Sequence, residues 1–245
     1  VLGDTHFGVS SDSLIFHEYF AKFYAFLFNY IDLNNIKYII QEGDLFDKRK
    51  IVNFLTLHRA KEMFFNECHK RGMKVFVIAG NHDCTYKNTN EVNSVKLLQE
   101  SCMTVIDQYP QTVKIGNTTV DFYPWINESN YNQTVELSNN PKSKIAVGHF
   151  EFSSFPMHPG TMAETGLDHK LFKNYETVYS GHYHTISTKD NIIYTGTPYE
   201  LNWSDCEDTK GFWIIDLDNE KTPEFIENPF KLYKKIVYTD RKSVV

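Results

Sequence analysis

The stretches KYIIQEGDLFD (residues 37–47) and MKVFVIAGNHD (residues 73–83) each pass from an apolar segment into a cluster of polar side chains. Their apolar parts, residues 37–41 and 73–79, are short and rich in Ile, Val and Phe, as buried strands are. Between them, residues 51–71 repeat apolar side chains at helical spacing and stop before a glycine. This strand–helix–strand order predicts parallel strands covered by helices.

The rest of the chain extends this pattern. A stripe of apolar side chains predicts a long helix over residues 14–33, and a shorter helix is predicted over residues 92–101. Gly116-Asn117, between two short β-rich runs, predicts a hairpin. We therefore expect an α/β fold that gives way to mostly antiparallel β structure, built as two packed sheets flanked by helices. Short strands after residue 103 are predicted at residues 112–115, 119–123, 144–147, 177–179, 192–195, 212–216 and 224–226.

Composition excludes several classes of protein. The chain has 245 residues, 41% of them hydrophobic, with 19 Phe and 15 Tyr, so it has ample apolar surface for a folded core. Its four cysteines include no CxxC pair, which excludes a disulfide scaffold and suits a reducing compartment such as the cytoplasm. The chain contains no run of about 18 apolar residues, so we expect neither a membrane span nor a membrane partner.

The formal charge of −6 argues against binding nucleic acid through overall charge alone. It leaves room for a nuclease that holds metal ions, because bound divalent cations dominate the field around them. Charge therefore restricts how nucleic acid is bound, and it does not exclude nucleic acid as a substrate.

The two ends of the chain carry separate expectations. Residue 1 is Val, and we expect the chain to be part of a longer protein. A boundary near Asn228-Pro229 divides a predicted main domain, residues 1–228, from a C-terminal region, residues 229–245. The basic side chains of this region predict either a DNA-facing surface or a solvated strand, and the sequence favours neither. Its basic side chains are Lys231, Lys234, Lys235, Arg241 and Lys242.

Polar clusters follow apolar strands at several places along the chain. Loops at strand ends converge in α/β folds, so we expect these clusters to meet. Glycines in the clusters let the backbone turn sharply and approach a ligand closely. The clusters are Asp4-Thr5-His6, Gly43-Asp44-Leu45-Phe46-Asp47, Gly80-Asn81-His82-Asp83, Gly148-His149 and Gly181-His182-Tyr183-His184.

The residue types in the clusters are those that bind divalent metal ions. Asp, His and Asn offer hard oxygens and borderline nitrogens without a thiolate, a set that suits Mn²⁺, Fe²⁺ or Zn²⁺. In DxH and HxH, side chains two residues apart in an extended segment point to the same side. The candidate ligands are Asp4, His6, Asp44, Asn81, His149, His182 and His184. They are too many for one tetrahedral ion, so we predict two ions with Asp44 as the bridging carboxylate.

Such a pair of ions suits phosphoester hydrolysis. Two metal ions ~3.5–4 Å apart can clamp a phosphoryl oxygen, activate a water and stabilise charge during in-line displacement. His82, beside Asn81, is then free to protonate the departing oxygen or to hold transition-state charge. Asp47 and Asp83 are candidates to orient His82 or to take part in proton transfer. Trp125 is expected to pack in the core rather than to form a base-stacking platform.

At these clusters the chain resembles the calcineurin-like metallophosphoesterase superfamily. The motifs DTH, GDLFD, GNHD, GH and GHYH occur in the same order over about residues 1–230. The resemblance implies a two-sheet sandwich with helices on both outer faces, and it places His82 at the family's catalytic histidine. It implies one metal ion held by Asp4, His6, Asp44 and His184, and another held by Asp44, Asn81, His149 and His182.

Further segments are similar to the DNA-repair nuclease branch, the SbcD type, and closest to the nuclease subunit of tailed-phage recombination endonucleases. They include Asp4-Thr5-His6-Phe7-Gly8, Tyr123-Pro124-Trp125 and Tyr194-Thr195-Gly196-Thr197-Pro198. The resemblance implies a DNA-binding exonuclease and endonuclease with two divalent ions, usually Mn²⁺. It also implies a homodimer that works with an SMC-like coiled-coil ATPase in double-strand-break repair and recombination. Residues 229–245 would begin the family's small C-terminal cap, and the compartment would be the cytoplasm, that of the host if a phage encodes the protein.

Two other functions stay open. A phosphatase or phosphodiesterase acting on proteins or small molecules would use the same metal chemistry. A catalytically silent scaffold would position an ATPase on DNA, but the complete set of ligands argues against it. Asp47 stands where some branches carry a histidine and where purple acid phosphatases need a tyrosine. Asp47-Lys48-Arg49 does not reproduce the Asp-Arg-Gly of protein phosphatases.

The implied dimer needs an apolar surface. The predicted helices at residues 51–71 and 92–101 are candidates, because each has apolar residues to spare. We expect one or both to lie in the contact between two copies of the chain.

Overall fold

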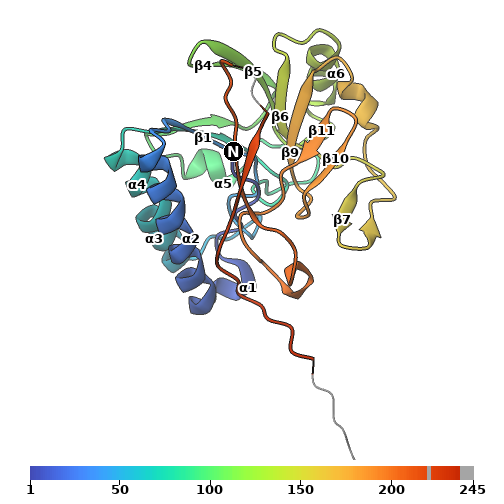
Figure 1. The fold of residues 1–245 in the computed structure, drawn as a ribbon. Coiled ribbons are helices and arrows are strands. Elements are labelled where there is room, and N and C mark those ends of the chain that lie inside the picture. The colour runs from blue at the N-terminus through green and yellow to red at the C-terminus, as the bar shows by residue number, and fades with distance from the viewer. Residues whose placement is uncertain (220–221, 238–245) are drawn as a thin grey trace, which may run out of the picture.

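The computed structural model describes residues 1–219 and 222–237 of the chain. Its first sheet has parallel strands in the order β1-β2-β3 (Figure 1). These are β1 (Tyr38–Gln41), β2 (Lys74–Ile78) and β3 (Met103–Ile106). Leu2 pairs with Gln41 through a single parallel bridge, so the first residues run alongside β1.

The second sheet has the strand order β10-β11-β9-β6-β5-β4. Its members are β4 (Gln111–Ile115), β5 (Thr118–Tyr123), β6 (Ile145–His149), β9 (Thr177–Gly181), β10 (Ser187–Lys189) and β11 (Ile192–Tyr194). β4 and β5 form the predicted hairpin, and β10 and β11 are antiparallel, but β5–β6, β6–β9 and β9–β11 are parallel. The second sheet is therefore mixed, with a parallel centre, whereas the sequence predicts that antiparallel structure prevails after residue 103.

The parallel pairing has a physical cause in the connections. The helix α6 (Tyr131–Asn139) lies between β5 and β6, and the 3-10 helix η2 (His169–Phe172) lies between β6 and β9. A crossover of this kind returns the chain to the same end of the sheet, so that the next strand runs in the same direction.

Helices in the first half lie where apolar spacing predicts them. α2 (Leu14–Leu33) begins and ends at the predicted residues. The predicted region 51–71 holds a continuous helical segment of α3 (Phe54–Ala60), the π-helical turn η1 (Lys61–Phe65) and α4 (Asn66–Lys70). α5 (Ser94–Leu97) is shorter than the predicted helix 92–101, and α1 (Val9–Asp12) is a single turn.

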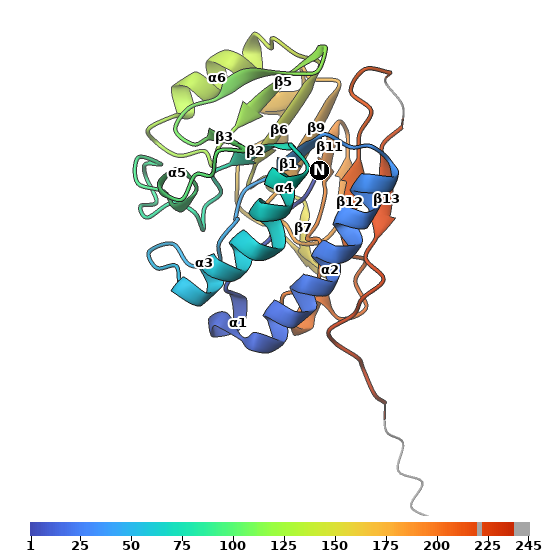
Figure 2. The same cartoon turned by 90° about the vertical axis from the view of Figure 1, so that its left-hand side faces the viewer.

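Three apolar clusters hold the layers together. One lies between the helices and the outer face of the first sheet and includes Phe23 and Val77. Another joins the two sheets, where the rings of Phe76 and Phe122 stack with centroids 5.9 Å apart. The third covers the far face of the second sheet and includes Phe172. Figures 1 and 2 show α2, α3 and α4 on one side of the sheets and α6 on the other, so the fold is the predicted α/β two-sheet sandwich.

The last described segment packs along the first sheet. β12 (Gly211–Ile214) and β13 (Glu224–Glu227) are antiparallel, and the backbone N–H of Trp213 donates to the Val1 carbonyl at 3.0 Å. After β13, Tyr233 and its neighbours pack against the cluster beneath α2. The division at residue 228 stays a prediction, and Arg241 and Lys242 of the basic cluster lie outside the described residues.

Smaller elements complete the described chain. They are the hairpin of β7 (Pro156–His158) and β8 (Thr161–Met162), and the 3-10 helix η3 (Trp203–Asp205). Among the helices of residues 1–219 and 222–237, none combines the length and the apolar character needed to cross a membrane.

Candidate metal centre

The predicted ligands lie at one end of the two sheets. Asp44 follows β1, Asn81 follows β2, His149 is the last residue of β6 and His182 follows β9. Residues 4–6 follow the bridge that joins the first residues to β1. Because parallel strands of one sheet end at the same edge, their loops bring these side chains together.

The first group of ligands contains Asp4, His6 and His184, whose ligand atoms all lie within 4.8 Å of one another. Nε2 of His6 is 4.0 Å from Oδ2 of Asp4, and Nε2 of His184 is 3.7 Å from the same oxygen. Both oxygens of Asp4 accept the backbone N–H of His182 at 3.0 Å, which fixes the carboxylate against the HxH loop. Asp4 and His6 are almost fully buried.

The second group contains Asp44, His149 and His182, with the amide of Asn81 between the two histidines. Oδ1 of Asn81 lies 2.9 Å from Nε2 of His149 and 3.0 Å from Nδ1 of His182. Nε2 of His149 is 3.4 Å from Oδ2 of Asp44. Neighbouring ligands of an octahedral ion at ~2.1 Å are ~3 Å apart, so these spacings suit one small divalent cation.

Asp44 belongs to the second group and also approaches the first. Its Oδ2 is 3.4 Å from Nε2 of His149 in one group and 3.7 Å from Nε2 of His6 in the other. His6, Asp44 and His82 also form a cluster with ligand atoms within 4.8 Å. The arrangement therefore places a single carboxylate close to histidines from both groups of candidate ligands, with His82 beside them.

The backbone at the centre is held in uncommon conformations. His6, Asp44 and His182 have φ values of 42°, 51° and 83°, in the left-handed region that non-glycine residues rarely adopt. Such strain persists where the surrounding structure enforces it, and it concentrates at functional sites. Gly80 permits the close approach of two loops, because a Cβ there would collide with the Asp44 side chain and amide.

The residues present fit a divalent cation. Nε2 of His6 is buried and has no hydrogen-bond partner, an arrangement that is costly unless a ligand satisfies the atom. Nδ1 of His149 donates to the carbonyl oxygen of Glu42 at 2.8 Å, which leaves Nε2 to face Asp44 and Asn81. An outer hydrogen bond of this kind is what fixes the orientation of a ligating histidine. The donor set of carboxylates, imidazoles and one amide contains no sulfur.

The charges of the centre are strongly coupled. Burial raises the pKa of Asp4 to about 6, despite the nearby His149. Burial opposes charge on His149 too, but Asp44 and Asp4 outweigh it and raise the pKa of His149 to about 10. Burial and the charge of His149 lower the pKa of His182 to about 3. In the protein without metal, Asp44 and Asp4 therefore favour the charged form of the His149 ring.

His82 is held by its neighbours at two points. Its backbone N–H donates to Oδ1 of Asp44 at 2.7 Å. Its ring Nδ1 lies 2.6 Å from the carbonyl oxygen of Asp47, and because a carbonyl only accepts, Nδ1 carries the hydrogen. The Asp47 carboxylate points elsewhere, with Oδ1 3.4 Å from Nδ1 of His6. Asp47 thus holds the His82 ring through its backbone.

The Asp83 side chain joins two loops of the centre. Its carboxylate is fully buried and accepts the backbone N–H groups of Leu45, Phe46 and Gly80 at 3.0–3.2 Å. It also accepts the hydroxyl of Ser94 at 3.1 Å. These bonds join the loop after β1 to the loop after β2, the two loops that carry Asp44 and Asn81. None of these four bonds is to His82.

Two supporting residues have little or no signal in the sequence. Glu42 orients His149 through its carbonyl, and its only signal is its place directly before Gly43-Asp44. Lys210 is fully buried, and its Nζ donates to the carbonyl oxygen of His184 at 2.7 Å. Asp205 and Asp208 balance its charge at 3.0 and 2.9 Å. No local pattern marks Lys210, because its partners come together only in the folded chain.

Comparisons with known proteins show which family the chain resembles. The family model of calcineurin-like phosphoesterases matches residues 1–186. Exonuclease subunit 1 of Enterobacteria phage T4 is 34% identical over 238 residues, which cover 97% of this chain and 69% of the relative. The DNA double-strand break repair protein Mre11 of Nanoarchaeum equitans is 25% identical over 219 residues, 77% of this chain and 56% of that protein. A subunit of the nuclease SbcCD from Staphylococcus saprophyticus is 29% identical over 187 residues, 62% and 48% of the respective chains.

Proposed function

Because the chain belongs to the calcineurin-like phosphoesterase family, we propose that it is a metal-dependent DNA nuclease that hydrolyses phosphodiester bonds at a dinuclear centre. The observation that carries this proposal is the position of Asp44 within reach of two separate groups of ligands. Relatives named as an exonuclease subunit, a nuclease subunit and a double-strand break repair protein support DNA as the substrate.

We assign the ligands as the resemblance implies. One ion would be held by Asp4, His6, Asp44 and His184, and the other by Asp44, Asn81, His149 and His182. When bound, two divalent cations, for which we propose Mn²⁺, polarise the phosphodiester and lower the pKa of a water at the site. The carbonyl of Glu42 keeps the His149 ring in the ligating orientation.

His82 is the proposed general acid. Hydrolysis forms a bond from water oxygen to phosphorus and breaks the bond from phosphorus to the leaving sugar oxygen, which needs a proton. With Nδ1 tied to the Asp47 carbonyl, Nε2 of His82 is the ring nitrogen left to supply that proton or to hold the charge. Asp83 acts as a positioning residue that keeps the Asp44 and Asn81 loops in register.

We also propose that the protein is a homodimer. Ile51 and Leu97 line one groove beside α5 and are 70% and 74% exposed, and Phe54 at the start of α3 is 89% exposed. Ile51 lies in the loop before α3, Phe54 begins α3 and Leu97 ends α5. These three side chains, here called the α3–α5 patch, fall within the two segments (residues 51–71 and 92–101) expected to form the dimer contact. Apolar side chains gathered in this way mark interaction surfaces.

The remaining proposals rest on the relatives. An SMC-like ATPase partner and a role in double-strand-break repair and recombination follow the resemblance to the SbcD type. The phage relative supports action in the cytoplasm of a host cell. We keep residues 1–228 as the phosphoesterase domain and residues 229–245 as the start of a cap.

One assay separates the candidate functions. The chain with Mn²⁺ is offered linear duplex DNA, single-stranded DNA, a chromogenic phosphodiester and a chromogenic monoester. Cleavage of DNA that His82→Ser abolishes while metal stays bound supports the proposal. Turnover confined to the small esters would favour a phosphatase or phosphodiesterase. No turnover with metal bound would favour a silent scaffold.

A further inference from the structure

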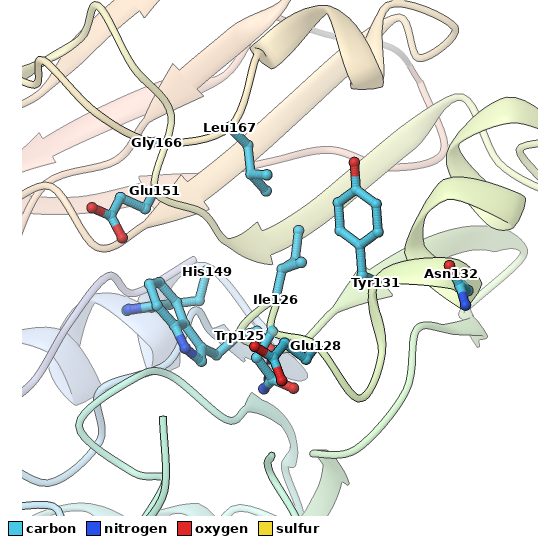
Figure 3. A pocket seen from close by; sticks show the side chains of 10 residues that line it. Trp125, Ile126, Glu128, Tyr131, Asn132, His149, Glu151, Gly166 and Leu167 are labelled. Atoms are coloured by element: carbon cyan, nitrogen blue, oxygen red, sulfur yellow. Dashed lines mark hydrogen bonds between the residues drawn. The ribbon is translucent and has the colours of Figure 1, made fainter. Parts of the chain in front are cut away.

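A cavity of about 500 Å³ opens directly beside the metal centre (Figure 3). One wall is the segment from Trp125 to Asn132, and the opposite wall is the loop that carries Glu151 and Leu167. His149, a proposed metal ligand, also lines it, so the cavity and the centre are continuous. Its volume is in the range of pockets that bind small ligands.

Trp125 forms the end of the cavity next to the metal centre. Its ring centroid is 5.3 Å from that of His182 and 5.9 Å from that of His149. Its backbone N–H donates to the Ala79 carbonyl at 2.8 Å, and its carbonyl accepts the Asn90 side chain at 2.8 Å. The indole is only partly buried, so Trp125 does not lie in the core as expected. It is a fixed aromatic surface at the edge of the cavity.

Apolar side chains continue this surface away from the centre. Ile126 and Leu167 are partly exposed, and Tyr131 is exposed at the rim. Figure 3 shows the ring of Tyr131 and the side chain of Ile126 pointing towards the loop that carries Leu167. A flat apolar ligand would therefore meet aromatic or aliphatic surface on both walls.

The charges of the cavity disfavour the binding of a second phosphate group there. Glu128 and Glu151 line it, and neither Lys nor Arg occurs among its described lining residues. Carboxylates repel phosphate, but they accept hydrogen bonds from the amino groups that adenine and cytosine carry. The cavity thus suits the neutral, flat and amino-bearing part of a nucleotide, while the adjacent centre suits the phosphate.

We propose that this cavity takes one unstacked nucleobase of the substrate strand, that of the nucleotide next to the scissile phosphate. The proposal rests on the proposed function, because the phosphate of that nucleotide is placed at the metal centre. A base can enter only after leaving its duplex stack, which costs least in single strands and frayed ends. Stacking on aromatic side chains tolerates different bases, so such a site would not demand one particular sequence.

Binding of two phosphates to the Mn²⁺-loaded chain tests the proposal. Deoxyadenosine 5′-monophosphate and deoxyribose 5-phosphate present the same phosphate and sugar, and only the first has a base. We expect calorimetric titration to give about tenfold tighter binding of the nucleotide, about 1.4 kcal/mol. Equal affinity of the wild-type chain for the two phosphates would overturn the proposal.

Variants of the cavity residues test whether the tighter binding of the nucleotide comes from the cavity. Trp125→Ala and Tyr131→Ala are each expected to bring the ratio of the two affinities towards one, and the ratio cancels any damage to phosphate binding that both ligands share. Tyr131 is the second variant because it lies farther from His149 than Trp125 does (Figure 3) and is exposed at the rim. Trp203→Ala is the matched control, since Trp203 is exposed and contacts Tyr233 instead. A ratio that survives both cavity variants would overturn the proposal.

Failure of the proposed function is distinguishable from failure of this inference. If neither deoxyadenosine 5′-monophosphate nor deoxyribose 5-phosphate binds, the proposed metal centre loses its support. Binding of deoxyadenosine, which has no phosphate, then tests the cavity alone. Quenching of tryptophan fluorescence by deoxyadenosine that Trp125→Phe removes would support the base site. Absent quenching, or quenching that Trp125→Phe leaves unchanged, would overturn it.

Discussion

The backbone N–H of His82 donates to Oδ1 of Asp44 at 2.7 Å, while Oδ2 of the same carboxylate faces His149 and His6. One oxygen of Asp44 therefore positions the proposed acid, and the other lies between the two groups of ligands. The bond to His82 uses the main chain, so the His82 side chain can be changed without removing it. This separation allows metal binding and proton donation to be tested independently.

Replacing His82 by Ser is expected to lower turnover about 10²–10⁴-fold, the usual range for a general acid, and to leave the metal content unchanged. Elemental analysis of the purified variant and single-turnover cleavage measure the two quantities. His58→Ser is the control, because His58 is an exposed residue of α3. Loss of metal from His82→Ser would instead identify His82 as a ligand.

Replacing Asp83 by Asn is expected to lower the free energy of unfolding by about 2–3 kcal/mol. The reason is that the backbone N–H groups that now donate to a carboxylate would face a neutral side-chain amide instead. Chemical denaturation of the metal-free protein measures this change. Glu18→Gln, on the exposed face of α2, is the control carboxylate-to-amide change. A variant of unchanged stability and lost turnover would contradict the positioning role and favour a direct part in catalysis.

Metal binding is expected to release about one proton at neutral pH. The pKa of His149 is raised to about 10 in the metal-free protein, so the ring is protonated below that pH and a cation must displace the proton. Affinity should fall as the pH falls, by about tenfold per unit for each proton released. Calorimetry in two buffers of different ionisation enthalpy measures the release, and an observed enthalpy independent of buffer would refute it.

The α3–α5 patch predicts the oligomeric state. Leu97→Asp is expected to convert a dimer at micromolar concentration into a monomer, because it places a charge in an apolar contact. Leu33→Asp is the matched control, since Leu33 is equally exposed at 74% but lies at the far end of α2. Sedimentation velocity distinguishes the states. A monomeric wild-type chain at this concentration would count against the proposed dimer.

Much of the first half of the fold could be predicted, because its elements are long or strongly apolar. The stripe of apolar side chains predicts a helix over about residues 14–33, where α2 lies. The parallel centre of the second sheet could not be predicted because the crossover helix α6 buries only Thr134 and Ser138, which leaves no apolar stripe to recognise. β7, β8 and β10 are two or three residues long, too short for a periodic pattern.

The candidate site, too, could be predicted from the sequence only in part. Its ligand types are visible because each occurs in a short motif directly after a strand. The part played by Asp47 is not visible in the sequence, since it holds His82 through a backbone carbonyl rather than its carboxylate. Lys210 and the cavity beside Trp125 depend on segments far apart in the sequence, so only the folded chain reveals them.

Electron paramagnetic resonance of the chain titrated with Mn²⁺ tests the central claim most directly. Two Mn²⁺ ions that share the Asp44 carboxylate, ~3.5–4 Å apart, are expected to give an exchange-coupled spectrum at two ions per chain. Asp44→Asn is expected to abolish the coupled signal. Saturation at one ion per chain, or a spectrum of isolated Mn²⁺ at full occupancy, would contradict a shared carboxylate and with it the dinuclear centre.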